Sequence, residues 1–383
     1  MLPDATIATF PMTDATVLFR EIAAPGGRGF GVATLNMPAA LNALSADMVR
    51  LLTPQLRAWA EDPAVAGIVL HAAGDKAFCA GGDLRQLHTS IRQHGADRNP
   101  YAERFFSEEY ELDHLIHTFP KPVLAWGHGI VMGGGVGLMA GASHRVVTER
   151  TRLAMPEIGI GLFPDVGGSW FLPRMPGRTG LFLALTAAPL NAADAVHCRL
   201  ADVFMPHDRK PQVFAAIAST PWAGEPASDG AALKELLALA AGDAAPPPSL
   251  VQRHADEIEA LVSGDDLRAI ATRLRALSHS ADPWLQAAGA AFGTGSPTSA
   301  ALAFELWQRG SSLSLADVFR LEYWAALGCC AHSDFAEGIR ALLIDKDRRP
   351  RWSPATLEDV TPALISDHLR PRGDLPARLA GLA

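Results

Sequence analysis

Short apolar runs alternate with longer amphipathic segments over the first 205 residues of the chain. The runs at 17–22, 31–35, 68–70, 123–126, 145–147 and 153–155 have the length and composition of strands. Apolar positions at 48, 51, 52, 56 and 59 lie on one face of a helix, for which Ser45 is a plausible N-cap. Further helices are predicted over 101–117 and 136–140. This alternation predicts an α/β domain over residues 1–205.

The pattern changes after residue 205. Residues 206–300 are rich in Ala and Leu, lack strand-like alternation and contain the linker-like stretch AAPPP at 244–248. Residues 319–326 and 335–344 again favour helix. We therefore expect a second region, 206–383, that is mainly helical and packs on the α/β core.

Composition narrows the range of partners. With 49% hydrophobic and 19% charged residues, the chain can bury a sizeable core. A net charge of −8 gives no basic surplus for nucleic acid. No segment has the length and polarity of a membrane span, and residues 1–19 contain no basic residue typical of a targeting segment. We expect a soluble, cytoplasmic protein.

Cysteine and histidine give no sign of a metal centre. The four cysteines show no C-x-x-C spacing, which favours reduced thiols packed in the core. His114 and His117 are three residues apart, but no Cys/His cluster accompanies them. No metal site is predicted.

The stretch from 127 to 168 carries the most chemical information. Gly133, Gly134 and Gly135 interrupt an apolar run, which indicates close approach of a ligand or another segment to the backbone. Glu157 and Asp165 are acidic residues in an otherwise apolar, glycine-rich segment, so their carboxyl groups are expected to be desolvated or held by donors. Bare amides beside two carboxyl groups suggest acyl chemistry.

A second glycine loop, at residues 80–82, precedes Asp83, a candidate cap for the following helix. Taken alone, this stretch is equally consistent with an ordinary strand-to-helix turn.

Four blocks of sequence resemble the crotonase (enoyl-CoA hydratase/isomerase) superfamily. They are DKAFCAGGDLR at 75–85, GIVMGGGVGL at 129–138, MPEIGIGLFPDVGGSWFLPRMPG at 155–177 and DFAEGIRALLIDKDRRPRW at 334–352. The last two, with the helix FFSEEYELDHLI, are similar to a branch that hydrolyses acyl-CoA thioesters in valine breakdown. The resemblance implies a spiral of ββα units followed by C-terminal helices.

The resemblance also implies roles for individual residues. The amides of Gly82 and Gly134 match the two that bind the thioester oxygen, although both glycines could simply form tight turns. Glu157 matches the catalytic glutamate. It could attack the thioester carbonyl to form an anhydride or act as general base on water; the resemblance favours covalent catalysis. The alternative is a buried glutamate that caps a turn.

Two further carboxyl groups are expected at the site. Asp165 stands where hydratases typically have glycine, and we expect it to bind a substrate hydroxyl and help position water. The alternative is an Asx-type turn before residues 166–168. Glu109 matches a substrate-contacting glutamate of the hydrolase branch; by itself it would be read as a solvated helix charge.

Gly137 separates the candidate reactions. Hydratases of the superfamily carry a second catalytic glutamate here, so hydration by two acids is not expected. The resemblance implies hydrolysis of 3-hydroxyisobutyryl-CoA, or a close short 3-hydroxyacyl-CoA, to the free acid and coenzyme A. No metal or redox cofactor is implied, and a homo-oligomer is left open. The alternatives are an enoyl-CoA hydratase/isomerase and a non-catalytic crotonase-like protein that acts by association.

Overall fold

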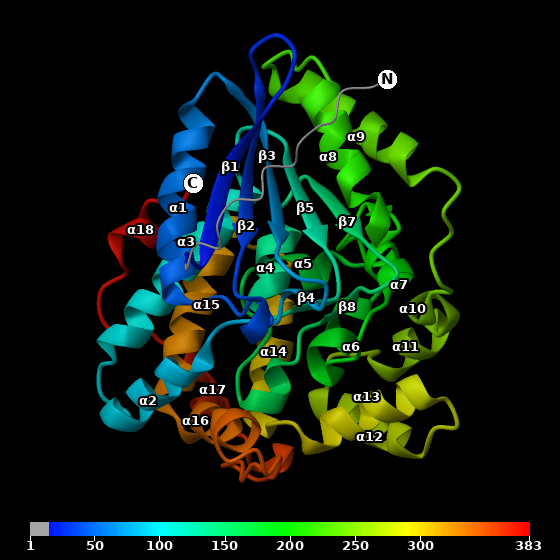
Figure 1. Cartoon of the computed structure of the whole chain (residues 1–383). Helices are drawn as coiled ribbons and strands as arrows, with labels where there is room; N and C mark the ends of the chain where they lie inside the picture. Colours follow the sequence, from blue (N-terminus) through cyan, green and yellow to red (C-terminus); the bar gives the residue numbers. More distant parts are fainter. Residues whose placement is uncertain (1–14) are drawn as a thin grey trace.

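The larger of two sheets forms the upper part of the molecule in Figure 1. The computed structural model describes residues 15–383. The sheet has the strand order β1-β2-β3-β5-β7-β9, and only β1 and β2 pair antiparallel. Its strands are β1 (Val17–Ala23), β2 (Gly29–Leu35), β3 (Val65–Ala72), β5 (Val123–Gly127), β7 (His144–Val147) and β9 (Val203–Phe204).

A second, three-stranded parallel sheet has the order β4-β6-β8. Its strands are β4 (Ala77–Cys79), β6 (Ile130–Met132) and β8 (Arg152–Ala154). Along the chain, β3, β5 and β7 are each followed by one of these short strands, so successive strand pairs contribute to two different sheets. This repeat is the expected spiral. The short strands β4 and β6 were not predicted, because three residues are too few to show a period.

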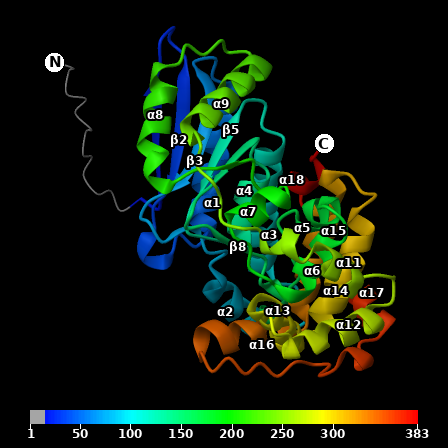
Figure 2. The ribbon, with the colours of Figure 1, turned by 90° about the vertical axis from the view of Figure 1, so that its right-hand side faces the viewer.

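Both faces of the large sheet are buried, which follows from the alternation of side chains along its strands. Leu70 packs into a core with helix α1 (Ala46–Glu61), while its neighbour Val69 packs into a second core with α8 (Lys210–Ser219) and α9 (Pro226–Ala241). Figure 2 shows α8 and α9 beside the sheet, away from the helices of the lower half.

Polar caps fix the starts of the helices that border the site. Ser45 accepts a hydrogen bond from Met48 N at the start of α1, as predicted. Asp83 accepts from Arg85 N at the start of α2 (Leu84–His94), also as predicted. Asn99 accepts from Ala102 N at the start of α3 (Pro100–His117). The helix α4 (Gly134–Ala140) instead has a glycine as its N-cap, Gly133, with a φ of 49°.

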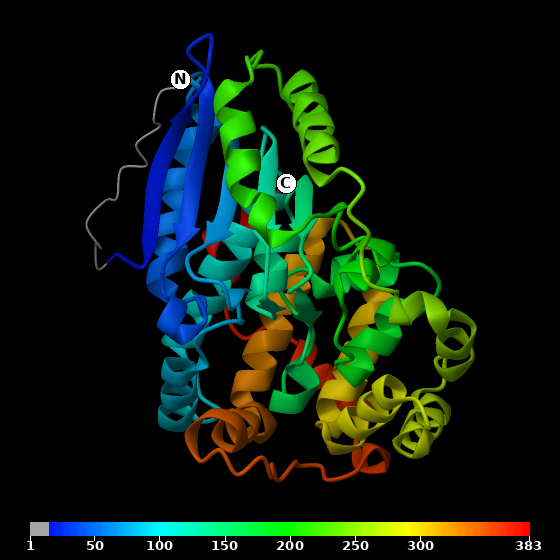
Figure 3. The same ribbon diagram turned by 45° about the vertical axis from the view of Figure 1, so that its right-hand side comes forward.

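The chain after residue 205 is helical in the described structure. Figure 3 shows the helices over residues 250–294 below the sheet, whereas α8 and α9 lie beside it. The helices after residue 249 share one hydrophobic core with the N-terminal strands, since that core contains both Leu35 and Phe335, while α8 and α9 pack in the other core. The division at residue 205 stays a prediction. Besides α8 and α9, the helices are α10 (Leu250–Arg253), α11 (Ala255–Leu261), α12 (Leu267–Ala276), α13 (Pro283–Thr294), α14 (Pro297–Gly310), α15 (Leu315–Ala331), α16 (Ser333–Ile339), α17 (Pro362–Leu369) and α18 (Ala377–Ala380).

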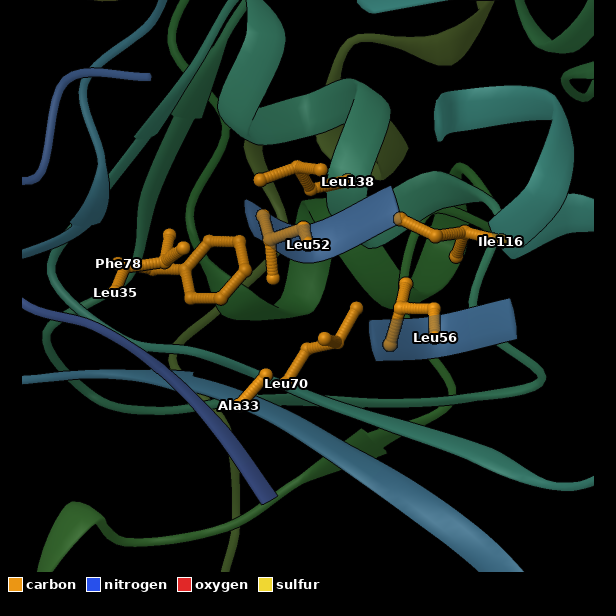
Figure 4. A pocket seen from close by; sticks show the side chains of 8 residues that line it. All are labelled: Ala33, Leu35, Leu52, Leu56, Leu70, Phe78, Ile116 and Leu138. Atoms are coloured by element: carbon orange, nitrogen blue, oxygen red, sulfur yellow. The ribbon is translucent and has the colours of Figure 1, made fainter. Parts of the chain in front are cut away.

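A small void lies between the large sheet and the helices α1, α3 and α4. Figure 4 shows the side chains around it, all of them apolar. Its volume of about 10 Å³ is too small for a substrate, and nothing polar lines it. This region is therefore packed core, and the site must lie elsewhere.

Candidate active site

Both glycine loops and all the predicted carboxyl groups line a single cavity of about 680 Å³. The volume is that of a typical small-molecule site. Its wall includes Gly82, Gly134, Glu109, Glu157 and Asp165. The structure therefore brings together every residue predicted for the site from segments up to 83 positions apart. Leu342 and Leu343, which follow α16, complete the wall.

The two glycine loops touch at this cavity. A side chain at Gly134 would place its Cβ 3.7 Å from the nitrogen of Gly82. In the described part of the chain, neither amide donates to a main-chain carbonyl. For Gly134 this follows from its position in the first turn of α4, where amides have no partner within the helix. Unpaired main-chain amides on two loops that touch are the kind of donor that an oxyanion requires.

Glu157 lies beside these loops. It starts the short helical turn η2 (Glu157–Ile160), is only 4% exposed, and its Oε1 would be 3.0 Å from a Cβ at Gly133. Its Oε2 is buried without a hydrogen-bond partner among the described residues. Burial, with the neighbouring charge of Asp165, holds the pKa of Glu157 well above its ordinary value. A desolvated carboxyl group of this kind is suited to attack on a carbonyl or to proton transfer.

Asp165 is held by a tyrosine. Tyr110, on α3, donates its hydroxyl to Asp165 Oδ2 over 2.7 Å, which leaves Oδ1 for a ligand. Burial raises the pKa of Asp165 to about 6, although the hydrogen bond from Tyr110 lowers it. The turn after Asp165 is closed by its main-chain carbonyl, which accepts from Gly168 N over 2.7 Å. The aspartate side chain is thus not needed for that turn, which disfavours the Asx-turn interpretation.

Glu109 is not a solvated helix charge. It is buried on α3, and its Oε1 would be 2.6 Å from a Cβ at Gly134. Burial and the charge of Asp165 raise its pKa well above the ordinary value. One helical turn later, Asp113 is fully buried with no partner for either oxygen among the described residues. The pKa of Asp113 is also raised, mainly by burial and to a lesser extent by the charge of Glu109.

Gly137 has no room for the second acid of a hydratase. A Cβ at this position would lie 2.6 Å from Val166 Cβ and 3.1 Å from Asp113 Oδ1. Both distances are shorter than ordinary contacts, so even alanine would force movement of the loop that carries Asp165.

Three residues that support or neighbour the site residues were not singled out from the sequence. Tyr110 and Asp113 belong to a helix whose apolar face was recognised, but their burial depends on packing against segments distant in the chain. Glu322, on α15, accepts hydrogen bonds from Gly167 N and Ser169 N, 155 and 153 residues away. No local pattern could have indicated that contact.

Comparison with known proteins supports the same class of protein as the geometry of the site. Residues 30–369 match the family model for enoyl-CoA hydratase/isomerase, and the chain belongs to this family. Its curated relatives include proteins named 3-hydroxyisobutyryl-CoA hydrolase, mitochondrial. The one from Xenopus tropicalis is 39% identical, over 96% of this chain and 93% of its own length. The human one is 36% identical, over 90% of this chain and 86% of its own length.

Two solved structures share the fold over nearly the whole chain. One is described as an enoyl-CoA hydratase from Rhodobacter sphaeroides 2.4.1 and the other as a carnitinyl-CoA dehydratase from Mycobacterium thermoresistibile. Each is 37% identical, with TM-scores of 0.80 and 0.81. The first alignment covers 93% of this chain and the second 94%, and both cover 98% of the other chain. The expected fold class is confirmed.

The expectation of a cytoplasmic location was wrong. The hydrolases compared above are named mitochondrial, which points away from the cytoplasm. That expectation came from the composition of residues 1–19, most of which lie outside the described residues, and composition does not determine a compartment. Within residues 15–383, no helix is both long and apolar enough to cross a membrane. The same part of the chain holds no group of three His, Cys, Asp or Glu suited to a metal ion, and all four cysteines are buried and unpaired.

Proposed function

We propose that this chain hydrolyses the thioester of 3-hydroxyisobutyryl-CoA, or of a close short 3-hydroxyacyl-CoA, to the free acid and coenzyme A. The names of its relatives support this activity, and one observation carries it. Two glycines with unpaired amides and a buried glutamate line one cavity, while the position of a hydratase's second acid has no space for a side chain.

The reaction begins with the thioester oxygen at the amides of Gly82 and Gly134. These donors stabilise the negative charge that develops when the carbonyl carbon becomes tetrahedral. Glu157 in its ionised form attacks that carbon, the carbon–sulfur bond breaks, and the coenzyme A thiolate takes up a proton from solvent to leave as a thiol. Water then opens the anhydride, which restores Glu157 and releases the acid. In the alternative route, Glu157 removes a proton from water, which itself attacks the thioester.

Asp165 and Glu109 select and orient the acyl group. The free Oδ1 of Asp165 accepts from the 3-hydroxyl of the substrate, and Glu109 contacts the acyl chain beside Gly134. The amides and carboxyl groups are sufficient for this chemistry, so the proposal requires no metal or redox cofactor. From the resemblance we further propose a place in valine breakdown. We also propose a homo-oligomeric state, which light scattering would test.

Hydration of an enoyl-CoA is the second candidate, because the two solved relatives are described as a hydratase and a dehydratase. The deciding assay follows free thiol with 3-hydroxyisobutyryl-CoA, 3-hydroxypropionyl-CoA and crotonyl-CoA. We expect thiol release from the 3-hydroxyacyl substrates and no loss of the crotonyl double bond. Hydration of crotonyl-CoA without thiol release from any substrate would overturn the proposal.

A hydroxylamine trap distinguishes the two routes of hydrolysis. If an anhydride forms, hydroxylamine added during turnover leaves a hydroxamate on the peptide that contains Glu157, which mass spectrometry detects. Under the general-base route, Glu157 remains unmodified.

A further inference from the structure

Glu322 connects the C-terminal helices to the loop that carries Asp165. It lies on α15 with none of its surface exposed. Its two carboxylate oxygens accept from Gly167 N and Ser169 N, each over 2.8 Å. No Lys, Arg or His in residues 15–383 forms an ion pair with it. Burial raises its pKa to about 8. A buried carboxyl group is costly, and here main-chain amides partly compensate for the lost solvation.

The loop held by Glu322 has an unfavourable backbone conformation. Val166 has a φ of 52° and Gly167 a φ of 87°. The left-handed region is strained for a β-branched residue, so such a conformation persists only where the surroundings enforce it. The two hydrogen bonds to Glu322 flank Gly168 and start directly after Val166. They therefore restrain the part of the loop that would otherwise relax.

The same helix also supports the partner of Asp165. Phe319, one turn before Glu322, packs against Tyr110 with ring centroids 5.8 Å apart. A Cβ at Gly167 would be 3.4 Å from the Phe319 ring. Thus α15 supports the loop through Glu322 and the tyrosine through Phe319, and these two elements together place the Asp165 carboxylate at the cavity.

We propose that Glu322 is a positioning residue for recognition of the substrate's 3-hydroxyl group: by fixing residues 166–169 it sets the place of Asp165. This inference rests on the proposed function in one respect, namely that Asp165 binds that hydroxyl.

The test replaces Glu322 by glutamine. Glu322→Gln preserves size but turns one acceptor into a donor that faces a main-chain N–H, so one of the two hydrogen bonds is lost. We expect kcat/KM on 3-hydroxyisobutyryl-CoA to fall about tenfold or more, while activity on isobutyryl-CoA falls much less. In an Asp165→Asn background, Glu322→Gln should cause little further loss, because the residue it positions is already inactive.

Asp229 provides a matched control. It is also buried, and its carboxylate accepts from Ala223 N and Gly224 N over 2.8 and 2.9 Å, but it lies on α9, which packs in the other core. Asp229→Asn removes the same kind of contact and should leave the preference for the hydroxylated substrate unchanged. Equal losses on both substrates in Glu322→Gln, or full additivity with Asp165→Asn, would overturn the inference.

A measurement independent of turnover separates this inference from the proposed function. Carboxyl NMR, assigned with Asp165→Asn, gives the pKa of Asp165, which we expect Glu322→Asp to change and Asp229→Asn to leave in place. Glu322→Asp is used here because it keeps a carboxyl group near Asp165, whose charge by itself affects this pKa. If wild type hydrolyses no 3-hydroxyacyl-CoA, the proposed function fails, but this pKa still decides whether Glu322 positions Asp165. Glu322→Asp withdraws the carboxyl group by one methylene, and it also replaces Glu322→Gln in the kinetic assay if that variant does not fold. An unchanged pKa of Asp165 in the folded variant refutes the inference.

Discussion

Removal of the Tyr110 hydroxyl is the most informative perturbation of the site. Tyr110→Phe deletes one buried hydrogen bond of 2.7 Å to Asp165 and leaves the ring in place. A hydrogen bond to an ionised group is worth about 1.5–3 kcal/mol. One pKa unit corresponds to about 1.4 kcal/mol. Because the bond favours the ionised carboxylate, its loss should raise the pKa of Asp165 from about 6 by roughly one to two.

The titration of Asp165 can be separated from that of Glu157 by comparing two substrates. Glu157 acts on every substrate, so its titration cancels when kcat/KM for 3-hydroxyisobutyryl-CoA is divided by that for isobutyryl-CoA at each pH. A carboxylate accepts from a hydroxyl more strongly than a neutral acid does. The ratio should therefore rise as pH increases through the pKa of Asp165, with a midpoint near pH 6 in wild type and roughly one to two units higher in Tyr110→Phe.

Tyr101 is the matched control, since it lies on the same helix and donates its hydroxyl to Gln86 rather than to the site. Tyr101→Phe should leave the midpoint unchanged. If the midpoint stays near pH 6 in Tyr110→Phe, or if both variants move it equally, the assignment of hydroxyl recognition to the Tyr110–Asp165 pair is refuted.

Three further outcomes are expected. Glu157→Ala should reduce kcat by at least about a thousandfold and leave calorimetric affinity for coenzyme A largely intact; substantial residual turnover would contradict its catalytic role. Asp113→Asn should stabilise the fold increasingly as pH rises. The raised pKa of Asp113 means that the folded state retains a proton that the unfolded state has lost, so wild-type stability is full below the unfolded pKa and is lost toward alkaline pH. Thermal unfolding of wild type and Asp113→Asn at pH 5 and pH 9 measures this difference in stability. An equal difference at both pH values would contradict the buried, protonated state of Asp113. Gly137→Glu should lower the melting temperature without producing hydration of crotonyl-CoA, because its Cβ would lie 2.6 Å from Val166; a stable variant that hydrates crotonyl-CoA would show that the space exists.

Local patterns were enough for the helices that border the site and for the chemistry of the glycine loops. The caps at Ser45 and Asp83 depend only on residues a few positions away, and both formed as predicted. Short strands such as β4 and β6 were missed, since their existence depends on pairing with each other and with β8.

The sequence by itself determined which residues could perform acyl chemistry: two glycine loops, Glu157 and Asp165, with a glycine at position 137. Tertiary structure alone decided that Glu109 is buried, that Tyr110 holds Asp165, and that Glu322 holds the loop beside it. The physical reason is that periodicity and turn preferences act over a few neighbouring residues. Burial and hydrogen bonding between segments 55 and 155 residues apart arise only when the whole chain has packed.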